Sequence, residues 1–143
     1  MRKIITVLLL VSTMMVALSA CGAGKVKIED YEWKMRTIVH TEDNQIVYDA
    51  VAEETATHPE ARMIEMTLAA KDGKIIITDI TNGRIYEGTY KVTQKTPAGT
   101  DYEVTIDGKS GYATAAMTKY ADGTKEPTLP ISLAGYSMYF YAE

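Results

Sequence analysis

The sequence predicts an all-β domain, an antiparallel meander of about eight or nine strands, and three observations support this fold class. From Tyr31 onward, apolar and polar residues alternate with a period of two, which is typical of strands with one buried and one solvated face. Asp-Gly and Asn-Gly pairs separate the alternating runs, and these dipeptides tolerate the positive φ angles of tight hairpins. Because so many short strands would leave exposed edges in an open sheet, the sheet is expected to close into a barrel or fold into two layers.

The first predicted strand runs from Tyr31 to Val39 and shows the alternation most clearly. One face carries Tyr31, Trp33, Met35, Thr37 and Val39, and the other carries Glu32, Lys34 and Arg36. Eight similar runs follow, at residues 45–53, 62–70, 74–80, 84–94, 100–107, 111–120, 128–133 and 136–142. The turn dipeptides are Asp72-Gly73, Asn82-Gly83, Asp107-Gly108 and Asp122-Gly123. Consecutive strands are therefore expected to pair antiparallel.

A closed or nearly closed barrel is favoured over the alternative, a β-sandwich. Gly88 lies in the middle of a predicted strand, between Tyr86 and Tyr90 on the face expected to point inward. Glycine at such a position allows the kink that a barrel wall often needs. The segment from Ala50 to Ala61 stays unassigned, because it fits either a loop or a short helix that ends before Pro59.

The first 20 residues differ from the rest of the chain and are expected to form a secretory signal peptide that is removed. Arg2 and Lys3 precede an apolar stretch of 15 residues, from Ile4 to Leu18, and small residues follow. A membrane-spanning helix needs about 20 apolar residues, so a permanent transmembrane anchor is the less favoured alternative.

Leu18-Ser19-Ala20-Cys21 resembles the lipobox of bacterial lipoproteins. The resemblance implies cleavage before Cys21, a diacylglycerol thioether on its sulfur and acylation of the new amino terminus. Two or more acyl chains hold a protein firmly in a bilayer, so the implied location is the extracytoplasmic face of the cell membrane, with the lipid on Cys21 as the anchor. The alternative is an ordinary signal peptidase site that leaves Cys21 as a free thiol. On the lipoprotein interpretation, residues 21–30 form a lipidated tether and residues 31–143 a single β domain.

Composition limits the classes of partner. Without Arg2 and Lys3 the chain has 13 basic and 19 acidic residues, a formal net charge of −6. Nucleic acid is therefore not an expected partner, because its binding requires a basic patch. Cys21 is the single cysteine, so the domain has no internal disulfide and depends on its core for stability.

The sequence predicts no catalytic, cofactor or metal site. His40 and His58 are 18 residues apart and lack the spacing of zinc ligands. The serines of the domain, Ser110, Ser132 and Ser137, lack the glycine frame of a nucleophile elbow. The Asp-Gly pairs lack the aspartate spacing of a calcium loop. Paired carboxylates stay open as an alternative, because only the fold decides which carboxylates meet.

With Trp33 on its first strand and a meander after it, the predicted domain resembles the lipocalin-like barrels of small bacterial lipoproteins. The lipocalin pattern has a glycine two residues before this tryptophan, where this chain has Tyr31. The resemblance implies the general barrel architecture.

Tyrosine dominates the aromatic residues, with ten copies against one tryptophan and one phenylalanine. A tyrosine ring buries apolar area while its hydroxyl seeks a partner, which suits barrel interiors and the rims of binding surfaces, although simple strand propensity also explains many of them. Two hypotheses follow. In the first, the barrel binds a small apolar or amphipathic ligand against Trp33, Met35, Tyr86, Tyr90 and Tyr102. In the second, the barrel is filled, and Tyr139 and Tyr141 on the last strand dock another envelope protein.

Overall fold

The structure, a computed structural model, describes residues 26–50 and 61–143. The expected signal peptide, the lipidation site Cys21 and the segment containing His58 lie outside these described residues. Within the two described ranges, no helix has both the length and the apolar character needed to cross a bilayer.

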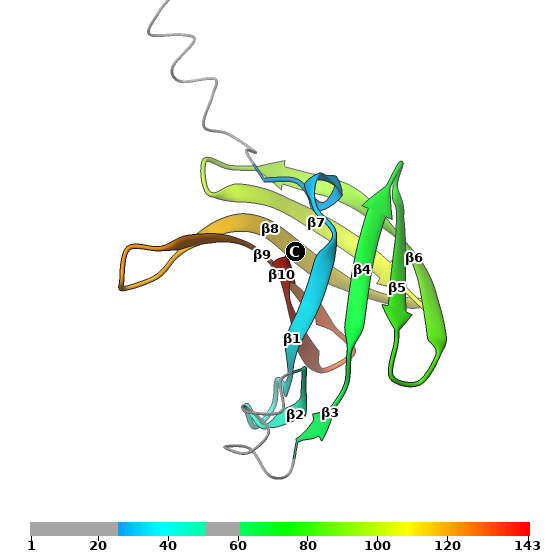
Figure 1. The fold of residues 1–143 in the computed structure, drawn as a ribbon. Helices are drawn as coiled ribbons and strands as arrows, with labels where there is room; N and C mark the ends of the chain where they lie inside the picture. Colours follow the sequence, from blue (N-terminus) through cyan, green and yellow to red (C-terminus); the bar gives the residue numbers. More distant parts are fainter. Residues whose placement is uncertain (1–25, 51–60) are drawn as a thin grey trace, which may run out of the picture.

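The described chain forms a 10-stranded sheet that closes on itself (Figure 1). Its strands are β1 (Trp33–His40), β2 (Ile46–Asp49), β3 (Arg62–Met63), β4 (Met66–Lys71), β5 (Lys74–Asp79), β6 (Arg84–Lys95), β7 (Gly99–Ile106), β8 (Lys109–Lys119), β9 (Lys125–Leu133) and β10 (Tyr136–Ala142). From β4 to β10 each strand pairs antiparallel with the next, and β10 closes an 8-stranded barrel by pairing with β1. The predicted all-β barrel is thus confirmed, and the alternative of a sandwich is wrong.

Two short strands lie outside the closed barrel. The first residues of β1 pair with β4, whereas Thr37 to Val39 pair with β2, and β2 in turn pairs parallel with β3. The run at 62–70, expected to be one strand, is therefore divided between β3 and β4, because its two halves have different neighbours. The expectation that consecutive strands pair antiparallel is wrong for β2 and β3, which pair parallel.

A β-bulge in β1 changes which side chains point inward. The pairing of β1 with β10 shifts register between Met35 and Thr37, which leaves Arg36 as the extra residue. A bulge reverses the alternation beyond it. Ile38, rather than the expected Thr37 and Val39, therefore follows Trp33 and Met35 into the core, and its side chain is 6% exposed.

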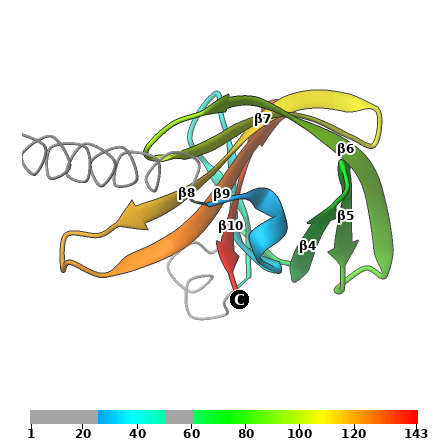
Figure 2. The same cartoon turned by 90° about the horizontal axis from the view of Figure 1, so that it is seen from above.

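Residues Val26 to Asp30 close one end of the barrel, with a single turn of 3-10 helix, η1 (Ile28–Asp30), lying across it (Figure 2). Val26 and Ile28 are fully buried. The backbone N–H of Ile28 donates to the Tyr102 hydroxyl at 3.0 Å, and the Thr100 hydroxyl donates to the Val26 carbonyl at 3.0 Å. The predicted tether, residues 21–30, therefore extends too far, because residues 26–30 belong to the folded domain.

The interior next to η1 is packed with large side chains that come from nearly every strand of the barrel. They are Trp33, Met35, Leu68, Ile75, Tyr102, Leu129, Ile131 and Phe140. The wall tolerates no side chain at Gly88, where a Cβ would lie 2.2 Å from the Thr105 carbonyl oxygen. The glycine expected to shape the barrel wall is thus a point of close backbone approach.

Tight turns join the strands as the dipeptides predict. Asp72 and Asp107 adopt positive φ angles of 51° each, followed by Gly73 and Gly108 at 78° and 74°. The β9–β10 turn has the same geometry with an alanine, since Ala134 has a φ of 51°.

Candidate ligand-binding site

A pocket of about 660 Å³ lies at the end of the barrel opposite η1, within the range of about 300–1,000 Å³ typical of small-molecule sites. β1 starts beside η1 and runs toward this end, where the β5–β6, β7–β8 and β9–β10 turns also gather (Figure 1). β2 and β3 extend the wall on one side, because they contribute Tyr48, Arg62 and Met63 to the lining. The two ends of the barrel therefore differ: one is plugged by the chain itself, and the other is hollowed.

Apolar side chains from four barrel strands and the β3–β4 link form the inner part of this pocket, and Tyr48 and Tyr86 add half-buried rings. The apolar residues, called the pocket floor below, are Ile38, Ile64, Met66, Leu133 and Met138. Ile38, Ile64 and Met66 are between 5% and 9% exposed. Such a floor suits an apolar group of a ligand, because burying that group removes apolar surface from water at about 25 cal/mol per Å².

Three basic residues line the outer part of the pocket: Arg62 at the start of β3, Arg84 at the start of β6 and Lys109 at the start of β8. All three are exposed. Among the described residues, none of the three takes part in a salt bridge. These residues are called the basic rim below.

Among the described residues that line the pocket, Asp79 is the one acidic residue, and it is 2% exposed. Both of its carboxylate oxygens accept hydrogen bonds from Asn82, one from the backbone N–H at 2.9 Å and one from Nδ2 at 2.8 Å. Its charge is therefore already engaged in holding the β5–β6 turn.

The five residues expected to contact a ligand occupy different places. Trp33, Met35 and Tyr102 lie in the packed interior, each at most 1% exposed, and do not line the pocket. Tyr86 is half-buried and lines it. The structure thus places Trp33, Met35 and Tyr102 in one buried core cluster, and Tyr86 packs against this cluster at the pocket.

Tyr90, the fifth of these residues, lies near η1. Its ring packs edge-on against Tyr102 with centroids 5.6 Å apart, and its hydroxyl donates to Glu29 Oε1 at 2.6 Å. Burial and the hydrogen bond to Glu29 raise the pKa of Tyr90 to about 12. Tyr90 therefore helps to hold the plug in place.

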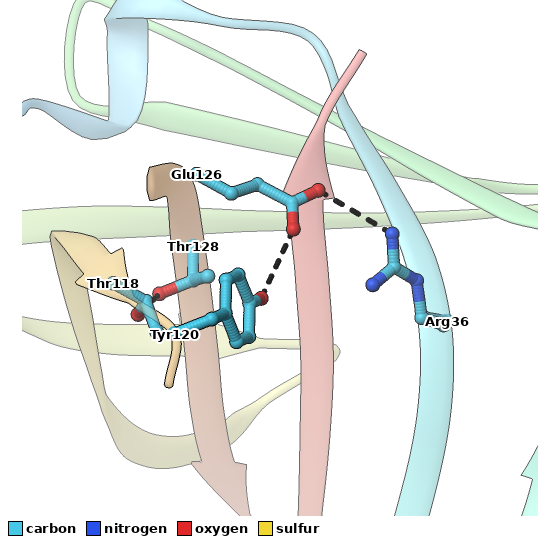
Figure 3. Close-up of polar contacts among 5 residues, drawn as sticks. All are labelled: Arg36, Thr118, Tyr120, Glu126 and Thr128. Atoms are coloured by element: carbon cyan, nitrogen blue, oxygen red, sulfur yellow. Dashed lines mark hydrogen bonds and ion pairs between the residues drawn. The ribbon is translucent and has the colours of Figure 1, made fainter. Parts of the chain in front are cut away.

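Tyr139 and Tyr141, the expected partner surface, lie on the outside of β10, while Phe140 between them is fully buried. The guanidinium of Arg36 covers the Tyr141 ring, 3.8 Å from its centroid, and also pairs with Glu126 at 3.3 Å. Tyr120, directly after β8, donates to the other oxygen of Glu126 at 3.0 Å, so β1, β9 and the β8–β9 connection are linked across β10 (Figure 3). Tyr139 is 38% exposed.

His40 lies outside the pocket, with Nδ1 at 3.0 Å from Asp43 Oδ1. The N–H of Gln45 donates to the same oxygen, and this bond together with His40 lowers the pKa of Asp43. In the described part of the chain, no three His, Cys, Asp or Glu side chains are grouped closely enough to hold a metal ion.

A second hollow, of about 690 Å³, lies beside η1. Its charged lining residues are Glu29, Asp30, Glu32 and Asp72, with Lys71 and Lys74. The plugged end of the barrel is therefore mainly acidic, in contrast to the basic rim at the other end.

The sequence missed most residues of the pocket. Thr37 and Val39 are expected on the inner face, but the bulge at Arg36 brings Ile38 there instead, and Ile64 lies within the expected strand 62–70, which does not continue through it. The sequence did contain one signal for the basic residues of the pocket. Arg84 and Lys109 each directly follow a turn dipeptide, and those two turns lie at the same end of the barrel.

Comparison with models of protein families, with curated proteins and with solved structures found no match to this chain.

Proposed function

We propose that this chain is a lipid-anchored protein of the extracytoplasmic membrane face, whose barrel binds a small apolar or amphipathic ligand without catalysis. The observation that carries the proposal is the contrast between the two ends of the barrel. Val26 and Ile28 fill the interior at one end, and none of the described residues lining the hollow beside η1 is buried, whereas the pocket of about 660 Å³ at the other end has a nearly buried apolar floor. A barrel built only as a scaffold would gain stability by filling both ends.

The support for the anchor comes from the sequence. The lipobox-like Leu18-Ser19-Ala20-Cys21 follows a charged start and an apolar core in the order that lipoprotein processing requires. A thiol suits this role, because its thiolate is a good nucleophile for accepting a lipid.

The anchor and the plug together suggest an orientation. Four residues lie between Cys21 and Val26, so the two Cα atoms are five steps of the chain apart and at most about 18 Å from each other when it is extended. The lipid would therefore hold the plugged end close to the bilayer. The pocket would open away from the membrane, toward ligands in the surrounding solution.

Docking through β10 is the second candidate, and it has less support. The Tyr141 ring is already covered by Arg36, so Tyr139 is the more accessible of the two tyrosines. Docking would leave the pocket without a role.

Native mass spectrometry of the lipidated protein, purified from its own host, tests the proposal. We expect an additional small mass bound to the wild-type protein and absent from Met138→Trp, because the larger side chain would fill the pocket from the floor. Met117→Trp is the matched control, since Met117 does not line the pocket and is 39% exposed. Absence of a bound mass from the wild type, or an equal amount in both variants, would contradict the proposal.

A further inference from the structure

We propose that the ligand of this pocket is an anionic amphiphile, whose charged group is held by Arg62, Arg84 and Lys109 while its apolar chain lies on the pocket floor. This inference rests on the proposed function, because it names the chemical class of ligand for the same pocket.

The first argument is the concentration of unneutralised positive charge. Among the described lysines and arginines, only Lys34 and Arg36 have acidic partners, Glu65 at 3.6 Å and Glu126 at 3.3 Å, so what distinguishes the basic rim is that three unpaired cations line one pocket. The three residues of the basic rim have no acidic partner within the described ranges, although residues 21–143 have an excess of acidic residues. Three exposed cations around one pocket create a positive potential that attracts anions.

Asp79 does not cancel this potential. Its carboxylate is buried and accepts two hydrogen bonds from Asn82, whereas the rim cations are exposed at the mouth. An arriving anion therefore meets three exposed donors before it approaches the Asp79 carboxylate. In the part of the lining that the structure describes, the basic side chains outnumber the acidic ones by two.

The second argument is the division of the pocket into two chemical zones. Ile38, Ile64 and Met66 offer nearly buried apolar surface, which a small hydrated anion such as inorganic phosphate would not use. A molecule with both an apolar chain and an anionic group matches both zones. Arginine is suited to the charged part, because its planar guanidinium binds carboxylate and phosphate with two hydrogen bonds.

The anionic group could be a free carboxylate or the phosphate of a lipid fragment. Both share the chemistry that the basic rim recognises, and they differ in charge and in the number of oxygens. An eight-carbon chain with each group, octanoate and octyl phosphate, distinguishes the two sources. Octanamide is the neutral probe with almost the same shape as octanoate.

Isothermal titration calorimetry of the full lipidated protein in phosphatidylcholine nanodiscs, with empty nanodiscs as the blank, tests the inference. We expect octanoate, octyl phosphate or both to bind at least about tenfold more tightly than octanamide, which corresponds to one or more charge-assisted hydrogen bonds. The tighter of the two anions identifies the source. The triple variant Arg62→Gln, Arg84→Gln, Lys109→Gln should lose this preference and keep its affinity for octanamide.

A second triple variant, Lys91→Gln, Lys95→Gln, Lys119→Gln, removes the same charge from exposed positions that do not line the pocket. It should keep the preference for the anionic probes. Equal affinity of the wild type for both anions and octanamide would overturn the anionic inference and leave the pocket proposal standing. Failure of all three probes to bind the wild type would overturn the pocket proposal itself.

Discussion

The indole Nε1 of Trp33 donates a 2.8 Å hydrogen bond to the carbonyl oxygen of Ile28, inside the barrel. Both residues are fully buried, so this bond ties the start of β1 to the plug that precedes it. Burial of Ile28 also requires a hydrogen-bond partner for its backbone N–H, and the Tyr102 hydroxyl on β7 accepts that bond. The plug is thus held from both sides of the barrel by its backbone.

Trp33→Phe should lower the free energy of unfolding by about 2–4 kcal/mol, because it leaves a buried carbonyl without its donor and a small cavity. Urea unfolding followed by circular dichroism measures the change, since Trp33 is the single tryptophan and its fluorescence is lost with it. Tyr31→Phe keeps the edge-on ring contact with Trp33 and serves as the control, with a change within about 0.5 kcal/mol. An equal loss in both variants would contradict the role of the Trp33 bond.

Gly88→Ala should destabilise the barrel by about 1–3 kcal/mol. The new Cβ would lie 2.2 Å from the Thr105 carbonyl oxygen, and backbone must move to make room. Thr89→Ala, at the exposed neighbouring position, should change stability by less than about 0.5 kcal/mol. Thermal unfolding of both variants compares them, and a Gly88→Ala protein as stable as the wild type would show that the wall can relax at no cost.

Ala134→Asn should stabilise the protein by about 0.5–1 kcal/mol, because Ala134 has a positive φ and asparagine tolerates the left-handed region better than alanine. Asp107 has the same φ of 51° in the β7–β8 turn. The reverse change there, Asp107→Ala, should destabilise by a similar amount. Chemical denaturation gives both values, and the prediction is wrong if the two changes share the same sign.

The Tyr90 hydroxyl predicts a stability loss at alkaline pH. Its pKa rises from 10.0 to about 12 on folding, so the folded state favours the neutral phenol. The stabilisation of the folded state by the neutral Tyr90 hydroxyl is fully present below pH 10 and is lost as the pH rises toward 12. Tyr90→Phe should therefore be less stable than the wild type near neutral pH and lose less stability between those two pH values. Urea unfolding across this range tests the difference, and parallel pH profiles would contradict it.

Cys21→Ser should abolish incorporation of labelled palmitate, because Cys21 is the single thiol of the chain. The wild-type protein, purified from its own host, should have an intact mass that begins at residue 21 and includes a diacylglyceryl group. A mass with the first 20 residues retained, or with an unmodified sulfur, would contradict the anchor. Membrane fractionation of both forms reports the consequence for location.

Much of the fold could be predicted from the sequence, because alternation and turn dipeptides are local signals. β5, for example, begins at Lys74 as expected, directly after the Asp72-Gly73 turn. What could not be predicted depends on contacts between distant parts of the chain. Val26 and Ile28 resemble a tether until the barrel end that buries them exists.

The start of β9 illustrates the same limit. The strand is expected at 128–133, yet β9 begins at Lys125, because β8 extends far enough to pair with it. Of the five residues expected to contact a ligand, only Tyr86 lines the pocket. A bulge at Arg36 and the pairing of β3 with β2 decide its lining, and neither has a local signal.

Methionine methyl NMR tests the central claim, that the hollowed end of the barrel binds an apolar chain, most directly. Five methionines follow residue 20, and they report on different parts of the molecule. Met63, Met66 and Met138 line the pocket, whereas Met35 lies in the packed core and Met117 lies outside the pocket. Titration of methyl-labelled protein with octanoate and with octanamide should shift the signals of Met63, Met66 and Met138 and leave those of Met35 and Met117 unchanged. Shifts confined to Met117, or no shifts with either probe, would contradict the claim.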